Sequence, residues 1–154
     1  MTLSQRVRTF NQPGYVGRRA GFVATIAVNL AMFWVVNNLL TWGVVPFLTA
    51  EFRQVLWLIE LSLAATILIN ASWLAYDVTW FRSLGQIFLN VLSAVVAISI
   101  YRVFPFDFSV YEFAWEPVAR AVIVLTVVGI VFGTVAELIK LARMAFPTTR
   151  SNSQ

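Results

Sequence analysis

The 154-residue chain lacks cysteine and histidine altogether. Without cysteine it forms no disulfide, no thiol redox relay and no thiolate metal site. Without histidine it has no imidazole to ligate haem, and it lacks the group on which most transition-metal centres and most proton shuttles near neutral pH depend. We therefore expect neither a metal nor another cofactor.

Charged residues are also scarce. They make up 12% of the chain, whereas 60% of the residues are hydrophobic and 15% are aromatic. Soluble domains carry about a quarter charged residues. The composition therefore indicates an integral membrane protein, and at this length we expect one membrane domain and no second folded domain.

Four long apolar segments follow one another, each about long enough to cross a hydrocarbon core of roughly 30 Å. We predict an all-α, integral membrane four-helix bundle with up-down-up-down topology. The transmembrane domain covers 20–144, with spans over about 20–45, 50–76, 79–104 and 117–144. A basic tail over 1–19 precedes the spans, and a short tail over 145–154 follows them.

Local signals set the ends of these spans. Gly43 and Pro46 stop the first span, because Pro46 lacks an amide hydrogen and clashes with the preceding turn. Thr49 is expected to cap the second span, with Glu51 in its first turn. The connector over 77–82 is so short that the second and third spans must be antiparallel neighbours.

Basic residues are distributed unevenly between the two sides of the predicted membrane. Eight lie on the side of the termini, namely Arg6, Arg8, Arg18, Arg19, Arg82, Lys140, Arg143 and Arg150. Three lie on the other side, namely Arg53, Arg102 and Arg120. The positive-inside rule therefore places both termini in the cytoplasm of a multi-pass plasma-membrane protein.

The arginines of the first tail have two interpretations. They either bind anionic lipid headgroups or only set the topology of the spans. We expect no nucleic acid as a partner, because the tail contains only four arginines and the high isoelectric point reflects the charges that set topology.

Polar side chains recur at the depth of the membrane. The predicted stripe consists of Asn29 in the first span, Asn70 in the second, and Gln86, Asn90 and Ser93 in the third. Because an unpaired amide in hydrocarbon is costly, these side chains are expected to face the bundle or a protein partner. Three interpretations remain: hydrogen bonds between helices, a water-lined or ion-lined path or small-ligand pocket between the second and third spans, and a contact between subunits.

Small and charged residues share one face of the fourth span. Gly129 and Gly133 have the small-xxx-small spacing that lets two helix backbones approach closely. We expect a close helix contact at Gly133, within the subunit or between subunits. Glu137 lies on the same face, three residues before Lys140, where the two side chains can pair or extend to the interface.

Glu60 is the one acid predicted inside the apolar part of a span, about 10 Å from the start of the second helix at 1.5 Å per residue. A carboxylate at this depth is a candidate for binding a proton or a cation. The structural alternative is an ion pair with Arg53, Arg102 or Arg120. The sequence leaves both interpretations open.

The connector between the third and fourth spans is rich in aromatic residues over 104–115, where Phe106, Asp107, Phe108 and Trp115 lie. Such a segment is typical of an aromatic belt at the outer membrane interface. It can also be a docking surface, or a lid over the outer mouth of the bundle, because an apolar stretch outside the membrane favours a partner.

No grouping of serine, aspartate and glutamate in the sequence forms a catalytic unit. We therefore predict a small non-enzymatic membrane protein that acts by association, as a homo-oligomer or as an accessory subunit of a membrane assembly. Its expected partners are membrane lipids and a second copy or another membrane protein. The alternative is a small ion channel or transporter that uses the polar faces of the second and third spans together with Glu60.

The predicted topology can be tested by labelling single cysteines, since the native chain has none. We expect Ser109→Cys to react with a membrane-impermeant thiol reagent added to intact cells, and Thr79→Cys to be protected. The opposite labelling pattern would place the termini outside the cell.

Overall fold

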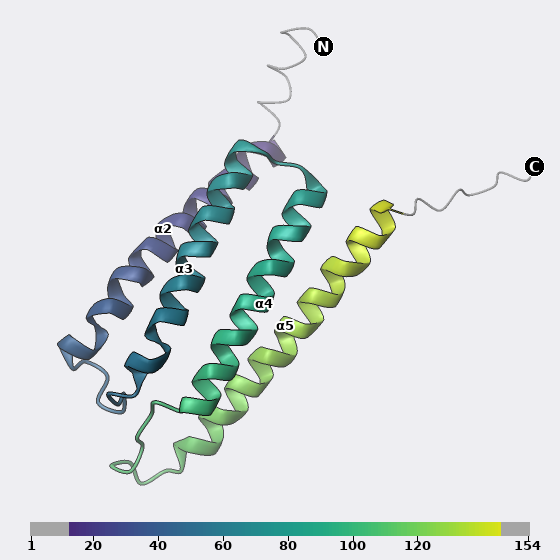
Figure 1. Cartoon of the computed structure of the whole chain (residues 1–154). Coiled ribbons are helices and arrows are strands. Elements are labelled where there is room, and N and C mark those ends of the chain that lie inside the picture. Colours follow the sequence, from purple (N-terminus) through teal and green to yellow (C-terminus); the bar gives the residue numbers. More distant parts are fainter. Residues whose placement is uncertain (1–12, 146–154) are drawn as a thin grey trace, which may run out of the picture.

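The computed structural model describes residues 13–145, which contain four α-helices (Figure 1). The helices are α2 (Pro13–Trp42), α3 (Phe52–Ala75), α4 (Thr79–Val103) and α5 (Trp115–Ala145). Each is long and apolar enough to cross a membrane. The prediction of an all-helical chain with four potential spans is confirmed, and the tail segments 1–12 and 146–154 lie outside the described residues.

The first helix begins and ends earlier than predicted. α2 starts at Pro13, whose fixed backbone angle suits the first turn of a helix. No further proline follows before position 46, and the glycines at 14 and 17 do not end the helix, so it also carries Arg18 and Arg19, which the sequence assigns to the basic tail. α2 ends at Trp42 because Gly43 adopts the left-handed conformation, with φ of +60°.

The predicted helix cap at Thr49 is wrong. α3 begins at Phe52, whose amide donates a hydrogen bond to the carbonyl oxygen of Thr49 at 3.2 Å, so Thr49 lies in a turn before the helix. Glu51 occupies the cap position, and its side chain makes no capping hydrogen bond. The Thr49 side chain instead hydrogen-bonds to the Glu51 carboxyl and lowers its pKa. This local pairing competes with capping of the helix amides.

Two connectors meet at one end of the structure, the one between α2 and α3 and the one between α4 and α5. The Thr49 amide donates to the Pro105 carbonyl oxygen at 3.0 Å, and the Asp107 amide donates to the Phe47 carbonyl oxygen at 2.8 Å. α4 ends at Val103, just before this contact, because the next residue, Phe104, has a φ of +44° that turns the chain out of the helix. Backbone hydrogen bonds therefore join the two helix pairs at this end.

The helices form a row in which each contacts its neighbours in the sequence (Figure 1). α3 packs against both α2 and α4, and α4 packs against α5. Within the part of the chain that the structure describes, neither α2 nor α3 contacts α5, and α2 does not contact α4. A bundle with a closed core requires such contacts, so the predicted bundle arrangement is not confirmed.

The buried core of this row is small. Its buried apolar residues are Val36, Phe52, Val55, Trp73, Leu89 and Ala97. Two polar residues, Asn70 and Ser83, are buried with them, whereas none of the residues of α5 is buried. The outward-facing side chains are mostly large and apolar, as is expected of helix faces that contact lipid.

A close contact between α3 and α4 lies at Gly85, a position that the sequence did not single out. A Cβ atom added to Gly85 would lie 2.9 Å from Cζ2 of Trp73 and 3.0 Å from Cγ2 of Ile69. The Trp73 indole is buried, and its Nε1 has no hydrogen-bond partner among the described residues. Glycine at position 85 therefore allows the indole ring to pack directly against the backbone of α4.

Gly85→Ala should lower the melting temperature of the protein relative to Gly129→Ala. Both substitutions gain about 1 kcal/mol in helix propensity. At position 85 the new methyl group must displace the buried Trp73 ring, and overpacking of this kind costs about 1 to 3 kcal/mol. A methyl group at position 129 meets no atom within 4 Å. Equal melting temperatures of the two variants in one detergent would show that α3 and α4 do not pack closely at Gly85.

Candidate functional site

A polar groove with a volume of about 460 Å³ runs along α2, α3 and α4. Its polar lining comes from all three helices: Arg18 and Thr25 of α2, Thr66 and Asn70 of α3, and Gln86, Asn90 and Ser93 of α4. The structure therefore brings four residues of the predicted stripe together around one groove. Thr25 and Thr66 add hydroxyl groups at the same place.

Asn29, the fifth residue of the predicted stripe, does not line this groove. Its Nδ2 donates a hydrogen bond to the carbonyl oxygen of Thr25 at 2.8 Å, within α2. The side-chain amide of Asn29 is thus bonded to its own helix.

The amide groups that line the groove are also hydrogen-bonded within single helices. Asn70 Nδ2 donates to the Thr66 carbonyl oxygen at 2.8 Å, and Gln86 Nε2 donates to Asn90 Oδ1 at 3.0 Å. In the described part of the chain no hydrogen bond joins Asn70 to Gln86 or Asn90. Because a primary amide has two N–H donors and an oxygen acceptor, these side chains keep the capacity to bind a further polar group.

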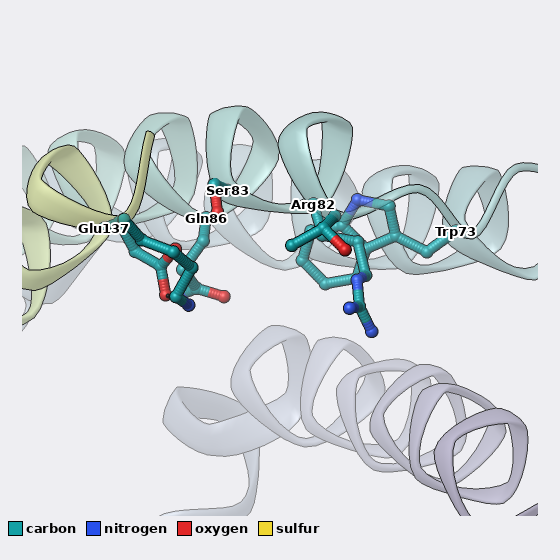
Figure 2. Close-up of a pocket in the computed structure, with 7 residues that line it drawn as sticks. Trp73, Arg82, Ser83, Gln86 and Glu137 are labelled. Carbon is teal, nitrogen blue, oxygen red and sulfur yellow. Dashed lines mark hydrogen bonds and ion pairs between the residues drawn. The ribbon is translucent and has the colours of Figure 1, made fainter. Parts of the chain in front are cut away.

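A second polar cavity, of about 270 Å³, lies beside the connector between α3 and α4. Figure 2 labels five of its lining residues, Trp73 from α3, Arg82, Ser83 and Gln86 from α4, and Glu137 from α5. Thr79 and Lys140 complete the lining. Because Trp73 and Gln86 line both cavities, the groove and this cavity are neighbours.

Asp77 connects three parts of the structure at this end. Arg18 Nε of α2 lies 3.4 Å from Asp77 Oδ2, and Arg82 Nη1 of α4 lies 3.2 Å from Asp77 Oδ1. The second contact is an ion pair without hydrogen-bond alignment. The Asp77 side chain is only 12% exposed. Arg19 Nη2 donates to the Leu74 carbonyl oxygen at 3.1 Å, which further joins α2 to the end of α3.

Glu137 and Lys140 form an ion pair within α5. Lys140 Nζ donates to Glu137 Oε1 at 2.7 Å, across one turn of the helix. Glu137 belongs to the cavity of Figure 2 and faces α4 there. The pairing expected from the i, i+3 spacing is therefore present in the structure.

The two glycines of α5 differ in their surroundings. A Cβ atom at Gly133 would lie 3.5 Å from Asn90 Nδ2 of α4, which is an ordinary van der Waals distance. A Cβ atom at Gly129 would meet nothing within 4 Å. Gly133 thus faces α4 within the chain, whereas Gly129 leaves open space beside α5.

Glu60 lies on α3, is partly buried, and lines neither of the two polar cavities. Within the described residues it forms no ion pair. Arg120, one of its three expected partners, lies 2.9 Å from Glu116 instead, and its guanidinium lies 4.1 Å from the centroid of the Phe104 ring. The structure therefore separates Glu60 from the polar groove.

The aromatic segment over 104–115 and Phe47 form an apolar cavity of about 460 Å³, which is lined by Phe47, Phe108, Tyr111 and Trp115. Phe106 stacks on Phe108 with a centroid distance of 6.1 Å. Asp107 Oδ1 accepts a hydrogen bond from the Ser109 amide at 2.9 Å, and this bond lowers the pKa of Asp107. The participation of Phe47 was not predicted, because it comes from the connector before α3.

The structure also assigns partners that the sequence did not predict, most clearly Arg18 and Arg82 around Asp77. Arg18 is remote from Asp77 in the sequence, and no periodic pattern connects the two residues. Among the residues that the structure describes, no group of three histidine, cysteine, aspartate or glutamate side chains is placed to hold a metal ion. No protein-family model, no curated protein and no solved structure matches this chain.

Asp77→Asn should lower the stability of the protein. The substitution leaves Arg18 and Arg82 without a carboxylate. The Asp77 side chain is largely buried but Arg18 is half exposed, so we expect a cost of about 1 kcal/mol. Glu116→Gln is the matched control, because it breaks the exposed Glu116–Arg120 pair, which is expected to contribute about 0.3 to 0.5 kcal/mol. Thermal unfolding of both variants in one detergent measures the difference. If they melt together, the Asp77 ion pairs do not hold the helices.

Proposed function

We propose that this chain is a small, non-enzymatic integral membrane protein that acts by association, as a homo-oligomer or as an accessory subunit of a membrane assembly. Its four helices cross the plasma membrane up-down-up-down, and both termini lie in the cytoplasm. The observation that carries this proposal is the open polar groove along α2, α3 and α4.

The groove extends to the depth of the hydrocarbon. Ser93 lies fourteen residues after the start of α4, about 21 Å along the helix axis and close to its middle. An amide or hydroxyl group that lacks a polar partner in hydrocarbon costs several kcal/mol. Association with a second copy or with another membrane protein would give the unused donors and acceptors of the groove their partners and would cover it from lipid.

The row arrangement supports the same proposal. α2 contacts only α3, α5 contacts only α4, and none of the residues of α5 is buried within the described chain. Helices in lipid associate by van der Waals packing and polar contacts rather than by a hydrophobic drive. Open space beside Gly129 gives a neighbouring helix room to pack closely.

A second candidate function is a small ion channel or transporter that uses the polar faces of α3 and α4 together with Glu60. The hydroxyl and amide groups of Thr66, Asn70, Asn90 and Ser93 around one groove favour this candidate. The position of Glu60 outside the groove does not, because a titrating group on the path would be expected to face it. Transport would be supported over association if liposomes that contain the protein show ion flux and each of the single variants Asn90→Leu and Glu60→Gln abolishes it.

Association through the groove predicts selective crosslinking in native membranes. We expect Ser93→Cys and Thr66→Cys to give covalent products of higher mass after oxidation, because both positions line the groove. Leu68→Cys and Val91→Cys are the controls, since these side chains of α3 and α4 are 70% and 55% exposed and neither lines the groove.

Two results would contradict this expectation. One is crosslinking of the control positions to the same extent as the groove positions. The other is a groove cysteine that stays monomeric and reacts fully with a hydrophilic thiol reagent, because such a groove is filled with water and not covered by protein.

A further inference from the structure

Two cavities lie next to each other where the N-terminal end of α4 faces the C-terminal end of α5. One is the polar cavity of Figure 2, and the other has a volume of about 500 Å³. Both are lined by Thr79 and Lys140, so Lys140 stands between them. The second cavity is lined on its remaining sides by Ala136, Ile139, Arg143 and Met144.

Positive charge is in excess at this end of the structure. The five basic residues in the described part of this end are Arg18, Arg19, Arg82, Lys140 and Arg143, and its acids are Asp77 and Glu137. Both acids are already paired, Asp77 with Arg18 and Arg82, and Glu137 with Lys140. An anion bound at this end would therefore lie near more basic side chains than carboxylates.

The side chains keep donors free for such an anion. Lys140 uses one of its three N–H groups for Glu137, and its side chain is 51% exposed. Arg82 pairs with Asp77 and lines only the neighbouring cavity, so it adds positive charge beside the crevice without lining it. Arg143, one turn after Lys140 on α5, is exposed and borders the second cavity.

The second cavity is suited to an acyl chain. Ala136, Ile139 and Met144 supply an apolar wall, and the small side chain of Ala136 leaves the crevice open. Lys140 lies five residues before the end of α5, and Arg82 lies three residues after the start of α4. At 1.5 Å per residue both are within about 8 Å of a helix end, the depth at which lipid phosphates meet a spanning helix.

We propose that this crevice between α4 and α5 binds one anionic glycerophospholipid, with its phosphate at Lys140 and Arg143 and an acyl chain along Ala136 and Ile139. Basic pockets between membrane helices on the cytoplasmic side are known to bind such headgroups. The inference rests on the proposed placement of the helices in a membrane, and it is independent of which protein covers the polar groove.

Native mass spectrometry of the purified full-length chain tests the site, with equal amounts of phosphatidylglycerol and phosphatidylcholine added. We expect wild type to retain phosphatidylglycerol in preference to phosphatidylcholine. Lys140→Gln and Arg143→Gln should each lower this preference by about fivefold, the effect of one basic residue near a lipid headgroup. Lys140→Arg should preserve it, because the charge is kept.

Matched variants separate this site from general charge effects. Arg53→Gln and Arg102→Gln remove the same charge at the other end of the structure and should leave the preference unchanged. Ala136→Trp fills the crevice without changing charge and should reduce retention, whereas Ala121→Trp, on the same helix but remote from the crevice, should not.

Three outcomes would overturn the proposal. They are equal retention of the two lipids by wild type, equal losses in the control variants, and displacement of the lipid by inorganic phosphate alone, which would indicate a site for soluble phosphate. Because binding is read on the mass of a single chain, a failure here leaves the crosslinking test of association unaffected.

Discussion

A polar group inside a bilayer has no water to bind, and this constraint explains much of the structure. Each helix satisfies its own backbone, and the amides of Asn29, Asn70 and Gln86 also make their hydrogen bonds within single helices. Such bonds stabilise a helix but do not fix it against a neighbour. The polar side chains therefore gather around a groove without closing it, and the remaining donors and acceptors are left for another molecule.

The two ends of the helix row are held by different interactions. At one end, backbone hydrogen bonds such as that from the Thr49 amide to the Pro105 carbonyl join two connectors, and within one of them Phe106 stacks on Phe108. At the other end, the ion pairs of Asp77 join α2, α4 and the connector between α3 and α4. Near the Asp77 end, the close packing of Trp73 on Gly85 also holds α3 to α4. Charge is thus concentrated where headgroups and water are expected.

The two proposed interactions use different parts of the molecule. The groove lies along α2, α3 and α4, whereas the basic crevice lies between α4 and α5 beside Lys140. Gln86 and Trp73 connect the groove to the cavity of Figure 2, which shares Lys140 with the crevice. A lipid bound at the crevice would therefore stand next to the surface at which a protein partner is proposed to bind.

The sequence by itself determined the four apolar helices, because helix length and hydropathy are local properties, and it identified the amides that face the groove from their spacing on α3 and α4. It did not predict the row arrangement, the pairing of Arg18 with Asp77 or the packing of Trp73 on Gly85. Local rules also failed at Thr49, where pairing with Glu51 replaced the expected cap. Only the tertiary structure decided these features. In lipid there is no hydrophobic drive between helices, so composition does not determine which helices pair. Each contact depends instead on which side chains fit together across a helix pair.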